Sequence, residues 1–178
     1  MYLSQLYLNA DDKVIAIGRS QEKYYNALHK IQHGRNNYHF IKADVKKYSE
    51  CERVSHDIEN NFPQADILIN SAGIYQEKAI EDVSELDFEQ VMGVNIKGTY
   101  FMCKYMIPLL KKSRQSPAIV NISSDAGING NYFCSLYCAS KGAVTVFTKA
   151  LALELAAVGI NTRNLAHDEQ GLKNRISE

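Results

Sequence analysis

The sequence predicts an α/β protein with a parallel sheet and helices on both of its faces, a three-layer arrangement. Short apolar runs alternate along the chain with longer segments of helical character, which is typical of parallel strands joined by crossover helices. The runs that begin at Val14, Ile67 and Ala118 are apolar almost throughout rather than alternating. Such runs are expected of strands that are covered on both faces.

Four strands and four helices follow from this pattern. The strands are expected at residues 14–18, 38–43, 67–70 and 118–123. The helices are expected at residues 21–33, 49–61, 86–112 and 136–157. Ser84 and Asp87 predict a capping arrangement at the start of the longest helix, and Gly159 is expected to close the last one.

Composition limits the classes of partner. The 178 residues are enough for one domain with a sizeable core, and 20 basic residues balance 20 acidic ones. A balanced charge does not favour binding to nucleic acid or to a membrane surface, so a small-molecule partner is expected. No apolar run approaches the roughly 20 residues of a membrane span, and Met1 is not followed by a signal-like segment, so we expect a cytoplasmic protein.

Cysteine and histidine spacing predicts no metal site. The cysteines lack a Cys-x-x-Cys spacing and are interpreted as reduced packing residues: Cys51, Cys103, Cys134 and Cys138. His29 and His33 are four residues apart on a probable helix, but no third ligand is nearby. A solvated helix face explains these two histidines better.

Polar and small residues follow three of the expected strands. They form the segments Gly18-Arg19-Ser20, Asn70-Ser71-Ala72-Gly73 and Ser123-Ser124-Asp125-Ala126-Gly127. Ligands of parallel α/β sheets collect beyond the carboxyl ends of the strands. These segments are therefore the candidate ligand-binding edge.

A tyrosine and a lysine four residues apart lie in the expected last helix. Tyr137 and Lys141 would share one helix face, as a proton-transfer pair requires. The spacing alone is weak evidence, because the pairs Tyr38 with Lys42 and Tyr100 with Lys104 repeat it.

Four ordered segments make one tyrosine pair specific. "ILINSAGI", "VNIKGTY", "IVNISSDAG" and "YCASKGAV" together resemble the short-chain dehydrogenase/reductase family, in its single-domain branch, over roughly residues 12–160. Ser71 replaces the second Asn of the family's Asn-Asn-Ala-Gly segment. The family places its catalytic serine thirteen residues before the tyrosine, and only Tyr137 has such a partner, Ser124.

The resemblance implies a catalytic role for four residues. Tyr137 would be the acid/base, Lys141 would bind the nicotinamide ribose, Ser124 would orient the substrate oxygen, and Asn95 would hold a water linked to Lys141. A free tyrosine, with a pKa of about 10, is a poor acid-base catalyst at neutral pH, and a nearby ammonium favours the phenolate form. The alternative is that Ser124 caps a strand end, Asn95 satisfies backbone groups and Tyr137 packs in a helix interface.

Cofactor contacts are implied in the same way. Asp44 in "IKADV" matches the position whose carboxylate contacts the adenine ring, and Val45 beside it is also placed in the cofactor-binding set. Asn70, Ala72 and Gly73 belong to the segment after the fourth family strand, and Tyr137 and Lys141 complete the set. Arg19 stands where an NAD-preferring member usually has an acid, and it would pair with a 2′-phosphate. NADP is therefore favoured over NAD. Asp44 as a strand-end cap and Arg19 as a solvated turn residue are the alternatives.

Both ends of the chain depart from the family pattern. The ten glycines include no Thr-Gly-x-x-x-Gly-x-Gly turn, so we expect a Rossmann-like domain, residues 1–160, without the first strand and its glycine-rich turn. Residues 161–178 are polar and lack the family's apolar strand and Pro-Gly turn. We therefore expect a divergent tail there, no C-terminal strands, and a chain truncated at both ends.

The expected activity is interconversion of a ketone and a secondary alcohol with NADP or NAD, on a 3-oxoacyl or polyol type of substrate. The alternative is an inactive family remnant that acts, if at all, as an interaction protein. The family also implies a homodimer or homotetramer through the helices at 86–112 and 136–157. Apolar residues there fit either pairing or core packing: Phe101, Met102, Met106, Val144 and Phe147.

Overall fold

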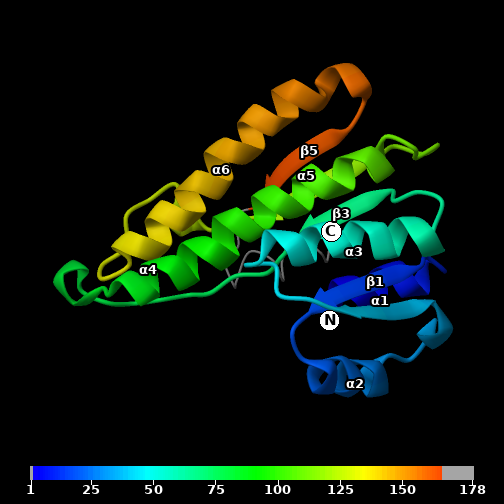
Figure 1. Ribbon diagram of the computed structural model, residues 1–178, viewed down its shortest axis with the longest axis horizontal. Helices are drawn as coiled ribbons and strands as arrows, with labels where there is room; N and C mark the ends of the chain where they lie inside the picture. Colours follow the sequence, from blue (N-terminus) through cyan, green and yellow to red (C-terminus); the bar gives the residue numbers. More distant parts are fainter. Residues whose placement is uncertain (1, 166–178) are drawn as a thin grey trace. The chain divides into compact units, whose positions relative to one another are not determined.

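The strands of residues 2–165 lie in two parallel sheets, one of two strands and one of three (Figure 1). The computed structural model describes residues 2–165. The chain has two compact units, with the boundary between Asp44 and Val45. The expected strands at 14–18 and 67–70 are confirmed at both ends, and those at 38–43 and 118–123 end one residue earlier. The α/β class with parallel sheets is confirmed.

The first unit is built on a pair of parallel strands. Its elements are α1 (Tyr2–Asn9), β1 (Val14–Gly18), α2 (Gln21–Lys30), a 3₁₀ turn (Arg35–Asn37) and β2 (Tyr38–Lys42). The strands pair in register from Val14 with Tyr38 to Gly18 with Lys42. The core of this unit gathers Leu8, Ile31 and Tyr38, with smaller or half-buried side chains packed around them.

Helix α2 ends three residues before the expected position. Ser20 caps its start, because its hydroxyl accepts a hydrogen bond from the Lys23 amide at 3.2 Å. The helix stops after Lys30 because Ile31 takes an extended conformation and turns its side chain into the core. Gly34 then reverses the chain at φ 73°, close enough to Leu8 that a Cβ would lie 2.9 Å from the Leu8 carbonyl oxygen.

The second unit carries a three-stranded sheet in the order β3-β4-β5 and the longer helices. Its main elements are α3 (Tyr48–Asn61), β3 (Ile67–Asn70), α4 (Glu85–Met92), α5 (Thr99–Leu110), β4 (Ala118–Ile122), α6 (Ser135–Leu155) and β5 (Asn161–Leu165). Short 3₁₀ turns lie between them at Ile80–Asp82, Asp125–Gly127 and Ala156–Val158. Among the residues described, β1 pairs only with β2, and β3 only with β4. Ile67 on β3 is 43% exposed.

The expected helix at 86–112 is three segments. A capping box joins Ser84 and Asp87 at its start, as predicted. After α4 the backbone follows π-helical hydrogen bonding over Gly93–Gly98 before α5 begins. Both glycines allow close approach: a Cβ at Gly93 would lie 2.7 Å from the Lys46 side chain, and one at Gly98 would lie 2.8 Å from that of Val45.

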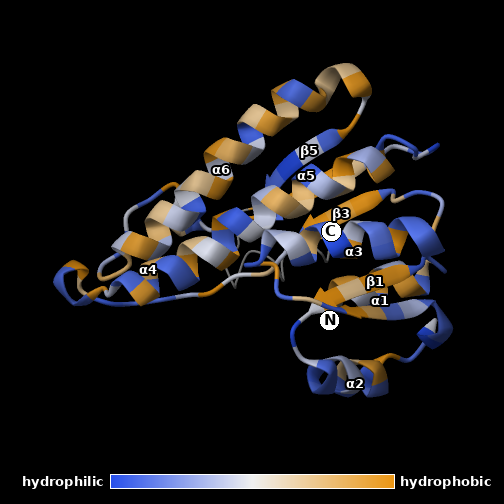
Figure 2. Cartoon of the chain, in the orientation of Figure 1, coloured by the Kyte–Doolittle hydropathy of each residue, from blue (hydrophilic) through white to orange (hydrophobic). Residues whose placement is uncertain are grey.

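Strand β5 corrects the expectation that no C-terminal strand is present. Asn161–Leu165 pairs in parallel with β4, from Ala118 with Asn161 to Ile122 with Leu165. Figure 2 shows that β5 is polar whereas β3 is apolar. The polar segment still forms a strand, because the pairing with β4 is made by backbone groups and not by side chains. Gly159 at φ 72° makes the turn into it, and Ile160 is buried. The rest of the predicted tail, 166–178, lies outside the described residues, and the predicted boundary at 160 stays a prediction.

Alternate residues of the larger sheet are buried beneath the helices. Leu68, Asn70, Ile119 and Asn121 are buried, while Ile69, Val120 and Ile122 between them are half-buried.

In the part of the chain described, no helix is long and apolar enough to cross a membrane.

Candidate active site

Lys141 lies in the second turn of α6, and its ammonium is held at the end of β4. The side chain is only 5% exposed, and Nζ donates a hydrogen bond to the Ile122 carbonyl at 2.8 Å. Burial lowers the pKa of Lys141, because the ammonium loses hydration. Nζ lies 5.9 Å from the ring centroid of Tyr137, so the helix places the two side chains together as their spacing predicted.

Asn95 is held in the middle of the π-helical segment by hydrogen bonds to both sides. Its Oδ1 accepts from the Ile74 amide at 2.7 Å, and its Nδ2 donates to the Ile74 carbonyl at 3.0 Å. Nδ2 also donates to Ser140 Oγ at 2.9 Å. The Asn95 side chain is buried, with 1% of the residue exposed. Its two bonds to Ile74 show that Asn95 satisfies backbone groups, as the alternative interpretation expects.

Ser140 joins Asn95 to the turn of α6 that carries Tyr137. Its hydroxyl accepts from Asn95 and donates to the Tyr137 carbonyl at 2.7 Å. This serine was not among the predicted site residues. Its place beside Lys141 in "YCASK", three residues after Tyr137, was the only available signal.

Gly73 is the point where the lysine and the asparagine approach each other. A Cβ at Gly73 would lie 3.4 Å from Lys141 Nζ and 3.6 Å from Asn95 Oδ1. Ala72 and Gly73 are exposed, whereas the Asn70 amide is buried and donates to Asn121 Oδ1 at 2.9 Å. Any contact of Asn70 with a ligand is therefore limited to its backbone.

The buried amides around Asn70 form a network within the second unit. Asn121 Nδ2 donates to Thr148 Oγ1 at 3.0 Å, and Asn70 Nδ2 also lies 3.3 Å from Cys103 Sγ. Burial raises the pKa of the Cys103 thiol to about 12. A protonated buried thiol agrees with the packing role predicted for this cysteine.

Ser124 caps the turn that follows β4. Its hydroxyl donates to Asp125 Oδ1 at 2.8 Å and accepts from the Ala126 amide at 3.2 Å. This is the strand-end cap of the alternative reading, and it leaves the side chain buried at the same strand end as the Ile122 carbonyl that binds Lys141. Catalytic hydrogen bonds are often made only in the substrate complex, so this geometry does not exclude Ser124 from the site.

The turn at Asp125–Gly127 packs directly on α6. Ser123 Oγ donates to the Lys141 carbonyl at 2.9 Å and lies 2.7 Å from Thr145 Oγ1. A Cβ at Gly127 would lie 2.7 Å from both the Lys141 carbonyl oxygen and Ser123 Oγ. Only a glycine fits here without displacing the backbone of the helix that carries Tyr137 and Lys141.

The other two tyrosine–lysine pairs lack this setting. Tyr38 and Lys42 lie on strand β2, where the spacing does not place them as it does on a helix. Tyr100 is exposed on α5, and Lys104 lies over the rings of Phe101 and Tyr105.

The predicted cofactor contacts are divided between the two units. Arg19 is exposed just after β1, and Asp44 ends the first unit. Val45 begins the second unit, with its side chain against Gly98. The four predicted catalytic residues, which we call the tetrad, all belong to the second unit: Asn95, Ser124, Tyr137 and Lys141.

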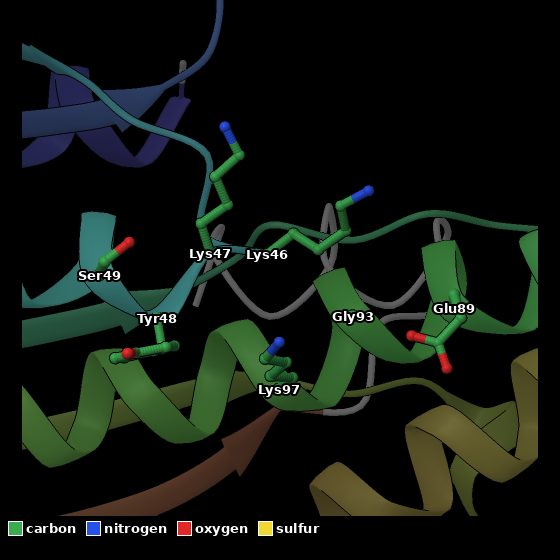
Figure 3. Close-up of a pocket in the computed structure, with 7 residues that line it drawn as sticks. All are labelled: Lys46, Lys47, Tyr48, Ser49, Glu89, Gly93 and Lys97. Atoms are coloured by element: carbon green, nitrogen blue, oxygen red, sulfur yellow. The ribbon is translucent and has the colours of Figure 1, made fainter.

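A pocket of about 370 Å³ lies elsewhere in the second unit (Figure 3). It is lined by Lys46, Lys47, Tyr48, Ser49, Glu89, Gly93 and Lys97. None of the tetrad residues lines it, and in Figure 3 the three lysine ammonium groups point in different directions. We therefore place the candidate chemistry at Tyr137 and Lys141 rather than in this pocket.

Comparisons with known proteins identify the family of the chain. A family model described as short chain dehydrogenase matches residues 2–167. The chain is 32% identical over 148 residues to a 3beta-hydroxysteroid dehydrogenase of Mediterraneibacter gnavus (83% of this chain, 53% of the relative). It is 37% identical over 153 residues to an NADPH-dependent pterin aldehyde reductase of Arabidopsis thaliana (83% and 62%). The structure of ElxO with NADP bound superposes with a TM-score of 0.85 at 32% identity, over 92% of this chain and 66% of that one. The chain thus spans between about half and two thirds of these proteins.

Proposed function

The chain belongs to the short-chain dehydrogenase family, and from this we propose that it carries the site of an NAD(P)-dependent oxidoreductase for a ketone and a secondary alcohol. One observation carries the proposal. Asn95 is linked through the Ser140 hydroxyl to the Tyr137 carbonyl, and Lys141 Nζ is hydrogen-bonded to the last carbonyl of β4. Gly73 lies beside both Asn95 Oδ1 and Lys141 Nζ, so the three residues meet in one cluster. A 3-oxoacyl or polyol type of substrate is part of the same proposal.

The residues of the cluster fit a nicotinamide cofactor. Gly73 leaves a side-chain-free approach beside Lys141 Nζ, and one Nζ proton is already engaged by Ile122, which fixes the direction of the ammonium. Its remaining N–H groups are suited to hold ribose hydroxyls. When bound, the cofactor supplies the hydride for the carbonyl carbon.

Tyr137 would then complete the reduction with a proton. Hydride addition leaves an alkoxide oxygen, and the Tyr137 hydroxyl donates its proton to that oxygen while Ser124 Oγ orients it. Lys141 stabilises the resulting phenolate through its charge. Asn95 holds the segment after β3 against α6, which keeps Gly73 beside Lys141.

NADP is the preferred cofactor in this proposal, with NAD the alternative. Arg19 is exposed directly after β1, which suits a guanidinium that pairs with a 2′-phosphate. The NADP in ElxO and the NADPH of the pterin aldehyde reductase support the preference. Arg19→Ala should then weaken NADPH binding more than NADH binding, whereas equal losses would reject this role of Arg19.

The direct test is a titration of the purified chain with NADPH, followed by the fluorescence of the cofactor, and then an assay of carbonyl reduction. Saturable binding and turnover are expected. Tyr137→Phe should lower turnover by about 10²- to 10⁴-fold while NADPH still binds, because only the proton donor is lost. Turnover that survives Tyr137→Phe would remove Tyr137 as the acid. If the native chain shows no turnover, the same variant is tested after a family-type first strand and glycine turn are added upstream.

A non-catalytic interaction protein is the second candidate. The observation that favours it is that the Asn95 and Ser124 side chains both have hydrogen-bond partners within the second unit itself. A folded chain that binds neither NADPH nor NADH would support this candidate. Binding of either cofactor would favour the enzyme.

We also propose that the chain pairs with a second copy through α5 and α6. Three of the apolar residues singled out in the sequence, Met102, Met106 and Val144, are core residues. Other apolar side chains on these helices are exposed: Tyr100, Val146 and Leu153, at 49%, 65% and 82%. Light scattering after size-exclusion chromatography should give a mass twice or four times that of one chain. Val146→Glu should reduce the measured mass to that of a single chain.

A further inference from the structure

Tyr75 lies against the tyrosine of the candidate active site with most of its surface open to solvent. Its ring centroid is 5.0 Å from that of Tyr137, at an interplanar angle of 74°. Tyr75 is 61% exposed, although it directly follows the segment that carries Gly73 and Ile74. An edge-to-face pair of this kind leaves one face of the Tyr75 ring available to a further flat group.

The ring of Tyr75 is fixed in place by its hydroxyl. Tyr75 Oη donates to Glu77 Oε2 at 3.0 Å and lies 3.4 Å from Cys134 Sγ. These hydrogen bonds raise the pKa of Tyr75, because they hold the phenol in its protonated form beside an acid and a thiol. Cys134 is buried just before α6, so the anchor of the ring is part of the fold.

The segment that follows Ile74 and the segment that precedes α6 are joined by a second contact, in addition to that between Tyr75 and Cys134. The Lys78 amide donates to the Phe133 carbonyl at 2.6 Å. Phe133 is held at φ 54°, a left-handed conformation that is costly for a bulky aromatic residue. Tyr132 and Phe133 are themselves exposed, at 83% and 44%, with ring centroids 4.0 Å apart. The segment just before α6 therefore also exposes aromatic surface, and one of its two aromatic residues is held in a strained conformation.

We propose that Tyr75 forms an aromatic wall of the substrate site, and that the site prefers carbonyl compounds joined to a flat aromatic or conjugated ring. This preference narrows the proposed function, because it argues against the polyol type of substrate named there. This inference rests on the proposed function for the reacting groups Tyr137 and Lys141. A flat ring packs on the open face of Tyr75 with little loss of side-chain freedom, because that ring is already fixed. A polyol needs hydrogen-bond partners from the wall, and the Tyr75 hydroxyl is already engaged by Glu77 and Cys134.

Two diketones that differ only in one group test the wall: 1-phenyl-1,2-propanedione and 2,3-butanedione. Binding is followed by NMR through the ring resonances of ¹³C-labelled tyrosines, with Tyr75→Phe and Tyr137→Phe used for assignment. We expect the phenyl compound to shift the Tyr75 and Tyr137 resonances and to bind at least about tenfold more tightly than 2,3-butanedione. Tyr75→Ala should weaken binding of the phenyl compound about 2- to 12-fold without changing that of 2,3-butanedione.

Controls separate the ring from its hydroxyl and from general damage. Tyr75→Phe keeps the ring and should keep the preference, and Tyr75→Leu replaces Tyr75→Ala if the alanine variant does not fold. Tyr25→Ala removes a tyrosine that is 49% exposed in the other unit and should leave both affinities unchanged. Equal affinity for the two diketones, no saturable shift with either, or full affinity in Tyr75→Ala would each overturn the wall.

The readout does not depend on turnover, so the two proposals fail in different ways. Selective binding of the phenyl compound without NADPH-dependent reduction would keep the wall and remove the oxidoreductase. Reduction of both diketones with equal affinity would keep the oxidoreductase and remove the wall.

Discussion

The two units of the chain differ in the polar groups that each one buries. The first, residues 1–44, depends on a small apolar core around Leu8, Ile31 and Tyr38. The second contains every buried polar or charged side chain in the described part of the chain, from Ser55 to Thr148. In the second unit, amides and hydroxyls are hydrogen-bonded across β3, β4, α6 and the π-helical segment.

In the proposed function, the groups that react lie in one unit and the residue that distinguishes NADP from NAD lies in the other. Apolar burial is non-directional, whereas a buried hydrogen bond fixes the angle and distance of both partners. Tyr137 and Lys141, the reacting groups of the proposed function, lie in the unit with the buried hydrogen bonds. Arg19 and Asp44, which the family resemblance predicts to contact the cofactor, lie in the unit with the small apolar core. We therefore expect substitutions in the two units to have separable consequences.

The largest effect is expected from Ile31→Ala. Ile31 is 1% exposed in a core of three large residues, so the cavity should cost about 2–5 kcal/mol of stability and open the whole first unit. Hydrogen exchange should become fast at the amides of β1 and β2 while β4 keeps its protection. Tyr25→Ala, at an exposed site of the same unit, is the control. Equal loss of protection in β4 would show that the two units unfold as one.

The next effect is expected from Gly127→Ala. The new methyl group would lie 2.7 Å from the Lys141 carbonyl oxygen, so α6 must shift and stability should fall by about 1–3 kcal/mol. Gly130→Ala is the matched control, because a Cβ there meets nothing within 4 Å. Thermal unfolding should show a midpoint several degrees lower for Gly127→Ala only. Equal midpoints for the two variants would contradict the close packing of the turn on α6.

The apolar strands and the main helices could be predicted because their patterns are local. Val14–Gly18 and Ile67–Asn70 are runs of apolar residues between polar breaks, and the structure keeps both boundaries. Strand β5 could not be found in this way. Its sequence, Asn-Thr-Arg-Asn-Leu, is polar, and it becomes a strand through the backbone groups that β4 offers. The π-helical segment has no periodic signal either, although its two glycines mark its ends.

The candidate site was predicted only as far as residue spacing reaches. Spacing placed Lys141 near Tyr137 and Ser124 at a strand end, and the structure agrees with both positions. Spacing could not indicate that Ser140 links Asn95 to α6, because that contact joins residues 45 apart in the sequence. The same holds for Tyr75 against Tyr137, which depends on how the segment after β3 turns back toward α6.

A smaller and more local effect is expected from Ser140→Ala. One Asn95 Nδ2 proton loses its acceptor in a buried site, which should cost about 1–2 kcal/mol. The Ile74 amide donates a hydrogen bond to Asn95 Oδ1, and its hydrogen exchange should accelerate about 5- to 30-fold. Ser135→Ala, exposed at the start of the same helix, should leave it unchanged. If Ile74 keeps its protection in Ser140→Ala, the serine is not part of the support of Asn95.

The smallest effect is expected where the directional contacts of the second unit reach its surface. A hydrogen bond from the Lys78 ammonium and further ones from Ser84 hold the pKa of Asp87 well below its usual range. Because the folded state lowers this pKa, the contact stabilises the fold fully above the unfolded value of about 4, and this stabilisation is lost progressively as the pH falls from there through the lowered folded-state pKa. Asp87→Asn should therefore lower the unfolding temperature most at pH 7, and the difference from the native chain should shrink steadily as the pH falls below about 4. Asp82→Asn, which changes the net charge equally in an exposed turn, is the control. If Asp87→Asn is as stable as the native chain at pH 7, the directional contacts that hold the second unit stop at its interior.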